Sequence, residues 1–211
     1  MKNFIDYKIY MFEGCDRTGK STFIDFLKTT LIEKGYHPFV FHLMGPPKFN
    51  GDFVLDNDEK SLAQLSKFND EYDLIREMLN TDDKCKIILD RTSFGEYIWT
   101  KYWQRHGMFT DYTTSSQFIE QHRDLMDESI YIDFWMSDIY KLTRRIEESP
   151  EDTKIFTIEE RSIEANIKYV YAMYEDLAKI IKDNKIDYMK IDASKFSTPD
   201  DDLVYINSLC K

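Results

Sequence analysis

The sequence lacks the patterns of a secreted, disulfide-bonded or zinc-ribbon protein. Its three cysteines, Cys15, Cys85 and Cys210, are far apart and form no Cys-x-x-Cys pair, so we expect neither a disulfide framework nor a zinc ribbon. A reduced, cytoplasmic setting is the simplest interpretation. Residues 1–10 mix charged and apolar side chains and lack the continuous apolar core of a signal peptide. No stretch approaches the roughly 18 apolar residues of a membrane span, so we expect no membrane partner.

Positive charge is also scarce. The 211 residues include 28 Lys and Arg against 39 Asp and Glu, which is a formal net charge of −11. Proteins that bind nucleic acid through its phosphates need a basic face, so no stable nucleic-acid partner is expected, whereas a small local anion site remains compatible. Hydrophobic residues make up 42% of the chain, which is enough for a core. The length suits a single domain over residues 1–211.

Strand-like and helix-like segments alternate along the chain. Short β-prone runs lie at residues 8–12, 38–42, 86–89, 130–134 and 188–191. Apolar residues at helical spacing predict helices at residues 21–33, 62–79, 94–104, 117–126, 139–147 and 200–209, and a long helix with an apolar stripe over residues 163–181. Strands separated by helices indicate an α/β fold, with a five-stranded parallel sheet, right-handed crossovers and helices on both faces.

Local signals predict where the later helices begin. Ser137 is expected to cap the helix at residues 139–147. Thr157 and Glu160 have the spacing of a capping box, which would open the long helix. The polar segment at residues 148–156 contains Pro150 and is interpreted as a loop.

A phosphate-binding motif follows the first predicted strand. Residues 14–21, Gly-Cys-Asp-Arg-Thr-Gly-Lys-Ser, match G-x-x-x-x-G-K-[ST] at every fixed position and open a predicted helix. Glycines let backbone N–H groups curl around an anion, and the helix N-terminus adds a partial positive charge. In this motif Lys20 would reach the β- and γ-phosphates of a nucleotide, and the Ser21 hydroxyl would hold Mg²⁺.

A second pair of charged residues, Asp90 and Arg91, follows the third predicted strand. Ligands of open α/β sheets gather outside the carboxyl ends of the strands. An acid at this position can bind Mg²⁺, and an arginine beside it offers two parallel donors to a second phosphate. A plain ion pair is the alternative.

A third group is basic and surrounds the Pro150 segment. Its members are Lys141, Arg144, Arg145 and Lys154. A lid at about residues 148–157 that carries such cations could close over transferring phosphates and exclude water. Acidic neighbours at positions 147, 148, 151 and 152 leave open the alternative of a solvated helix face crossed by salt bridges.

At these residues the sequence resembles the thymidylate kinase family of P-loop nucleoside monophosphate kinases. Residues 12–22, FEGCDRTGKST, are similar to the family's [FL]-E-G-x-D-x-x-G-K-S-T. Residues 90–95, DRTSFG, are similar to D-R-Y-x-x-S, and residues 191–194, IDAS, to V-D-A-S. The similarity in segment order covers nearly the whole chain. It implies the P-loop NTPase fold with strand order 2-3-1-4-5, a small lid and often a homodimer.

The resemblance also implies a reaction and a set of site residues. The reaction is transfer of the γ-phosphoryl group of ATP, with Mg²⁺, to dTMP or a related deoxynucleoside monophosphate. Arg17 matches the P-loop arginine that stabilises the transferring group, Asp16 the acid near the acceptor sugar, Arg91 the acceptor-phosphate ligand and Asp90 the acid associated with Mg²⁺. The implied catalytic set is Arg17, Lys20, Arg91, Arg144 and Arg145. The implied nucleotide-binding set is Gly14, Cys15, Asp16, Arg17, Thr18, Gly19, Lys20, Ser21, Thr22 and Ala193.

Several positions depart from the family pattern and leave the acceptor base open. The acid-plus-arginine turn after the second strand is replaced by His-Leu-Met-Gly-Pro-Pro at residues 42–47, and Asp70 aligns with the arginine that reads thymine. Thr92 replaces the tyrosine of D-R-Y. Phe68 and Tyr72 would stack on a base in the substrate site or, at helical spacing, belong to the core. Another deoxynucleotide or a modified pyrimidine is therefore compatible.

Two other functions remain open. A deoxynucleoside kinase shares the P-loop but deprotonates a sugar hydroxyl, so it needs a carboxylate base near the end of the second strand. Residues 39–48 contain none, although Asp52 or Asp56 could fold back and supply one. The second alternative is a P-loop protein that binds nucleotide as a switch without transferring phosphate. Such a protein would not need a second phosphate site at Asp90 and Arg91.

Overall fold

The computed structural model describes residues 2–42, 57–95, 98, 119–157, 162–196 and 198–210. Its centre is a five-stranded sheet in which every pairing is parallel. The strands are β1 (Ile9–Glu13), β2 (His37–Phe41), β3 (Cys85–Asp90), β4 (Ser129–Trp135) and β5 (Asp187–Asp192). Their spatial order is β2-β3-β1-β4-β5, which confirms both the predicted strands and the order that the resemblance implies.

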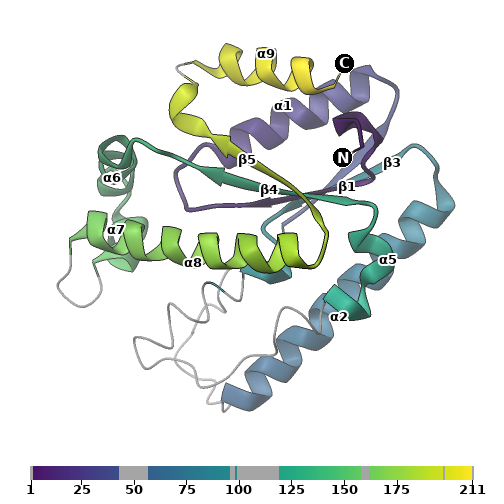
Figure 1. Cartoon of the computed structure of the whole chain (residues 1–211), viewed down its shortest axis with the longest axis horizontal. Helices are drawn as coiled ribbons and strands as arrows, with labels where there is room; N and C mark the ends of the chain where they lie inside the picture. Colours follow the sequence, from purple (N-terminus) through teal and green to yellow (C-terminus); the bar gives the residue numbers. More distant parts are fainter. Residues whose placement is uncertain are drawn as a thin grey trace.

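Helices cover both faces of the sheet (Figure 1). The helices α1 (Lys20–Glu33) and α9 (Pro199–Leu209) lie on one face, and α2 (Asn57–Thr81) and α8 (Ile163–Asp183) lie on the other. The short helix α5 (Arg123–Met126) precedes β4, and α6 (Ile139–Glu147) and α7 (Pro150–Phe156) follow it. Two 3₁₀ turns, η1 (Phe4–Asp6) and η3 (Ala193–Lys195), complete the described elements. No helix among the described residues is long and apolar enough to cross a membrane.

The buried pattern of the central strands explains their sequences. All five residues of β1 are buried, and β3 is buried over Cys85–Leu89, because a strand between two helical layers has no solvent-facing side. The ring of Phe23 on α1 lies 5.8 Å from that of Phe12 on β1 and 5.2 Å from that of Phe134 on β4. These contacts hold the N-terminal turn of α1 against the ends of the two central strands.

The segment predicted as a loop around Pro150 is instead the helix α7. Proline breaks the interior of a helix but suits its first position, where the missing N–H is not needed. Ser149 supplies the N-cap, and its side chain accepts from the backbone N–H of Asp152. The loop prediction was wrong because it treated this proline as a breaker and not as a helix start.

Two predicted helix caps are also wrong. Asp138, and not Ser137, caps α6, since its carboxylate accepts from the backbone N–H of Lys141 at 2.9 Å. Thr157 closes α7, while α8 begins at Ile163 with Ser162 as its N-cap. Of the two helices predicted at residues 94–104 and 117–126, the first lies mostly outside the described residues, and α5 covers the last four residues of the second.

Candidate functional site

The loop from β1 to α1 has the backbone of a phosphate cradle. Gly14 and Gly19 have φ angles of 149° and 98°, and Arg17 between them has a φ of 63°. A side chain on Gly14 would overlap the carbonyl oxygen of Phe134 and lie 2.9 Å from its carbonyl carbon, so the loop runs directly against β4. Positive-φ residues next to a helix N-terminus turn successive N–H groups toward one point, and this concavity binds anions.

Lys20 and Asp90 form an ion pair beside this loop. The lysine lies in the first turn of α1 and the aspartate at the end of β3, and their side chains are only 7% and 13% exposed. The Nδ1 atom of His42 lies 3.1 Å from the second carboxylate oxygen of Asp90. Burial raises the pKa of Asp90, but Lys20 and His42 outweigh burial and hold this pKa below its ordinary value. Asp90 is therefore ionised at neutral pH and able to bind a cation.

Arg91 joins the end of β3 to the P-loop. Its backbone has a left-handed φ of 71°, and its N–H donates to the Phe12 carbonyl at 2.9 Å. Its guanidinium donates to the carboxylate of Asp16. Burial lowers the pKa of Arg91, but the adjacent Asp16 carboxylate more than offsets burial and raises it. The arginine and the acid that the resemblance assigns to the acceptor are thus in direct contact.

Glu13 is a buried acid next to the P-loop for which the sequence analysis predicted no role. It is fully buried at the end of β1, and its Oε1 accepts from the backbone N–H of Thr92 and, at 2.7 Å, from the Thr92 hydroxyl. Burial raises the pKa of Glu13, against the opposing effects of Arg91 and these hydrogen bonds. A side chain on Gly95 would come within 2.5 Å of the same oxygen. An acid at the end of an otherwise apolar strand was the signal that could have identified it.

The P-loop arginine is in contact with α7. The Nε atom of Arg17 donates to Asp152 at 2.5 Å, and one of its terminal nitrogens donates to the Ser149 hydroxyl at 2.7 Å. From α6, Arg145 donates to the backbone carbonyl of Arg17 at 3.1 Å. The segment expected to act as a lid thus lies directly against the phosphate-binding loop.

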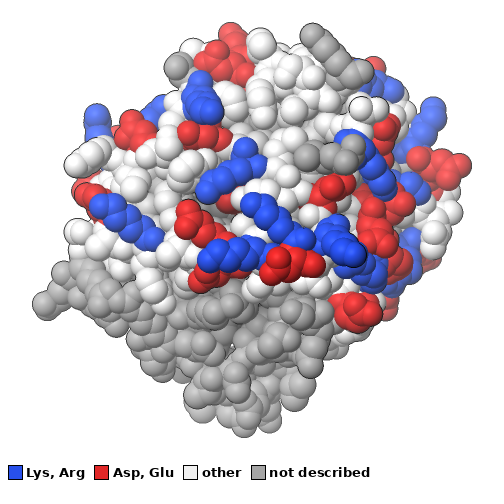
Figure 2. Space-filling view, viewed as in Figure 1, with Lys and Arg blue, Asp and Glu red and all other residues white. Residues whose placement is uncertain are grey.

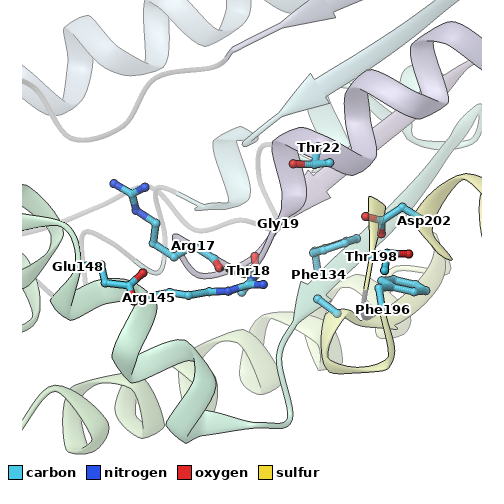
Figure 3. A pocket seen from close by; sticks show the side chains of 11 residues that line it. Arg17, Thr18, Gly19, Thr22, Phe134, Arg145, Glu148, Phe196, Thr198 and Asp202 are labelled. Atoms are coloured by element: carbon cyan, nitrogen blue, oxygen red, sulfur yellow. Dashed lines mark hydrogen bonds between the residues drawn. The ribbon is translucent and has the colours of Figure 1, made fainter. Parts of the chain in front are cut away.

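A cavity of about 560 Å³ opens beside the P-loop. It is lined by residues Arg17, Thr18, Gly19, Thr22, Phe134, Arg145, Glu148, Ala193, Phe196, Thr198 and Asp202. In Figure 3, Arg145 and Glu148 lie on one side of the P-loop, and Phe196, Thr198 and Asp202 lie on the other. The cavity therefore pairs a phosphate cradle with an aromatic and polar wall, which are the parts that a nucleotide needs.

Asp202 is a second residue that the sequence analysis missed. It lies in α9, after a capping box formed by Thr198 and Asp201. Burial and the neighbouring Asp201 raise the pKa of Asp202 to about 6, against the opposing effect of Arg145. Because α9 follows β5 by only a few residues, its first turn reaches the same end of the sheet as the P-loop.

Most of the predicted site residues fall into three groups. Those that line the cavity are Arg17, Thr18, Gly19, Thr22, Arg145 and Ala193. Those in ion pairs beside it are Asp16, Lys20, Asp90 and Arg91. Arg144, Phe68 and Tyr72 do not line this cavity. Arg144 lines a neighbouring cavity of about 470 Å³ that shares Arg145 and Glu148 with the first. The two aromatic side chains are buried, and the Tyr72 hydroxyl lies 3.5 Å from that of Ser93.

The remaining predicted positions differ in how they are presented. Ser21 is exposed in the first turn of α1, as a metal ligand in this motif should be, whereas the Cys15 side chain is buried. Gly14 contributes through its backbone. Asp52 and Asp56 and the side chain of Lys154 lie outside the described residues.

Charge on the molecular surface is mixed. Figure 2 shows Lys and Arg interspersed with Asp and Glu on the face viewed. Within the described ranges, no three His, Cys, Asp or Glu side chains gather as a protein-only metal centre would. A Mg²⁺ ion shared between protein oxygens and phosphate oxygens needs no such cluster, so Ser21 and Asp90 fit a metal that arrives with a nucleotide.

Comparison with known proteins identifies the fold. Thymidylate kinase from Ehrlichia chaffeensis aligns over 96% of this chain and 97% of its own, with a TM-score of 0.54 and 15% identity. Deoxyadenosine kinase from M. mycoides with bound dATP aligns over 97% and 100%, with a TM-score of 0.55 and 18% identity. YorR from Bacillus subtilis, in complex with phosphorylated GDP, aligns over 95% and 96%, with a TM-score of 0.54 and 16% identity.

Searches by sequence add nothing to this. No family model and no curated protein matches the chain. The structural similarities, at these identities, establish the fold of the P-loop nucleoside and nucleotide kinases. They include enzymes named for both of the acceptors considered above, a monophosphate and a nucleoside.

Proposed function

We propose that this chain, which has the fold of the P-loop nucleoside and nucleotide kinases, is a nucleoside monophosphate kinase similar to thymidylate kinase. It would transfer the γ-phosphoryl group of ATP to dTMP or a related deoxynucleoside monophosphate. The observation that carries the proposal is the position of Arg91 next to the phosphate-binding loop. A P-loop with a nucleotide-sized cavity adjoins Arg91, which β3 and Asp16 hold beside that loop.

The chain's own residues would catalyse phosphoryl transfer by aligning the two substrates and neutralising their negative charge. Lys20 and the N–H groups of the P-loop would bind the phosphates of ATP. Arg17 would stabilise the transferring group, and Arg91 would bind the acceptor phosphate. Ser21 and Asp90 would hold Mg²⁺, which supplies charge neutralisation between the phosphates. The ion pair between Lys20 and Asp90 supports these roles, because it holds both side chains beside the P-loop.

The monophosphate is favoured over the nucleoside as acceptor by the chemistry of the described site. A phosphate oxyanion needs no strong base to attack, whereas a sugar hydroxyl does. The residue that follows β2 is His42, and its ring contacts Asp90. The sequence has no carboxylate at residues 43–48. Deoxynucleoside kinase activity remains the second candidate, because one of the similar structures carries that name.

The test is an ADP-release assay with ATP, Mg²⁺ and each nucleoside and each deoxynucleoside monophosphate in turn. We expect turnover with one or more deoxynucleoside monophosphates. Strong turnover with nucleosides and none with monophosphates would reverse the ranking. Binding of ATP without transfer to any acceptor would point instead to a nucleotide-binding switch. A Lys20→Ala variant, which removes the phosphate-binding amine, serves as the negative control for each reaction.

A further inference from the structure

The Arg17 side chain is held by α7, a helix far from it in the sequence. Asp152 and Ser149 accept from two different nitrogens of its guanidinium, at 2.5 and 2.7 Å. The side chain of Arg17 is 51% exposed, whereas that of Asp152 is only 16% exposed. An arginine with this much access to solvent ordinarily samples many rotamers. The hydrogen bonds to Asp152 and Ser149 restrict the guanidinium of Arg17 to a single position next to α7.

The helix that provides these contacts is itself well anchored. The Thr153 hydroxyl donates to the Ile146 carbonyl at 2.9 Å, which ties α7 to α6. At the other end of α7, Phe156 is fully buried, and its carbonyl accepts from the side chain of buried Asn166 on α8 at 2.6 Å. α7 is therefore a fixed support, and the position of Asp152 is determined by two neighbouring helices.

The backbone of the P-loop is held from the same direction. Arg145 donates to the carbonyl of Arg17, which has a left-handed φ of 63°. Both the backbone and the side chain of this one residue are thus contacted from the α6–α7 pair. A salt bridge as exposed as this one adds little to the free energy of unfolding. Holding the Arg17 guanidinium in place before the reaction can instead lower the barrier to phosphoryl transfer.

We infer that Asp152 is a positioning residue for phosphoryl transfer. Through its contact with Arg17 it holds the guanidinium, together with Ser149, in the place where charge develops in the transition state. The inference rests on the proposed kinase function. The sequence predicted that cations of this segment would act on the phosphates. In the role inferred here, an acid of α7 and the hydroxyl of its N-cap residue act on Arg17 of the P-loop instead.

The test is a double-mutant cycle on the full-length chain. Asp152→Asn keeps an oxygen that can accept from Arg17 but removes the charge, and Asp152→Ala removes both. We expect Asp152→Ala to lower kcat about 10- to 100-fold, with the KM for ATP changed less than threefold and a smaller loss for Asp152→Asn. In an Arg17→Ala background, which is itself slow, either substitution at position 152 should change kcat less than twofold.

Two further measurements separate positioning from general stability. Asp176→Asn removes the charge from an exposed ion pair with Lys179 on α8 and should leave kcat unchanged. The NMR signal of the Arg17 Nε–H should show an ordered side chain in the wild type and a mobile one in Asp152→Ala, whether or not the protein is turning over.

The outcomes are distinguishable. If the wild type transfers no phosphoryl group to any acceptor, the proposed function fails and the positioning role fails with it. If the wild type is active and Asp152→Ala retains full kcat, raises it, or loses activity equally in the Arg17→Ala background, only the positioning role is overturned.

Discussion

Replacement of Gly14 by alanine tests whether the P-loop depends on its contact with β4. The added methyl group would overlap the Phe134 carbonyl oxygen, and this carbonyl belongs to a strand that is paired on both sides. Such a backbone cannot move aside, so we expect an overpacking cost of about 1–3 kcal/mol. The φ of 149° at Gly14 adds about 1–2 kcal/mol for a residue with a side chain. The combined loss in unfolding free energy is about 3 kcal/mol.

Thermal and urea denaturation would measure this loss. For a chain of this size, about 3 kcal/mol corresponds to a fall in Tm of about 6–12 °C. Gly35→Ala is the matched control, because its φ is also positive, at 82°, but no atom lies within 4 Å of the added carbon. It should cost only about 1 kcal/mol. Equal destabilisation by the two substitutions would refute the argument that close approach to Phe134, and not φ alone, requires glycine at position 14.

Three other predictions address the groups around the P-loop. Thr92→Val keeps the shape of the side chain but removes the hydroxyl that donates to buried Glu13, so the free energy of unfolding in urea should fall by about 1–3 kcal/mol; an unchanged value would contradict the role given to this hydrogen bond. Because the pKa of Asp202 is raised from 3.8 to about 6, the folded protein binds this proton more tightly than the unfolded chain, and this group's contribution to stability should decline as pH rises from about 4 to about 6. The difference in Tm between wild type and Asp202→Asn should shift over that window, and a constant difference would rule the linkage out. Lys20→Ala and Arg91→Ala should each lower turnover about 10³-fold or more without changing the far-UV circular dichroism spectrum. Near-normal activity of either purified variant would show that the replaced side chain is not needed for the reaction.

Much of the fold could be predicted from local pattern. The five strands were identified because each is a short β-prone run, and the P-loop because its fixed residues lie between a strand and a helix. The errors were local as well. Pro150 was interpreted as a helix breaker, although Ser149 before it made it a helix start. The spacing of Phe68 and Tyr72 did not show whether they belong to the core or to the substrate site, because apolar residues of either kind recur at helical spacing.

What the sequence by itself determined is the set of parts: alternating strands and helices, a phosphate cradle after the first strand, and an acid–arginine pair after the third. Only the tertiary structure decided which of these parts meet. The contacts of Glu13 with Thr92, of Lys20 with Asp90 and of Arg17 with Asp152 join residues 79, 70 and 135 positions apart. The physical reason is that periodicity and capping are short-range, whereas these pairs depend on which strands become neighbours and on which end of the sheet each crossover returns to.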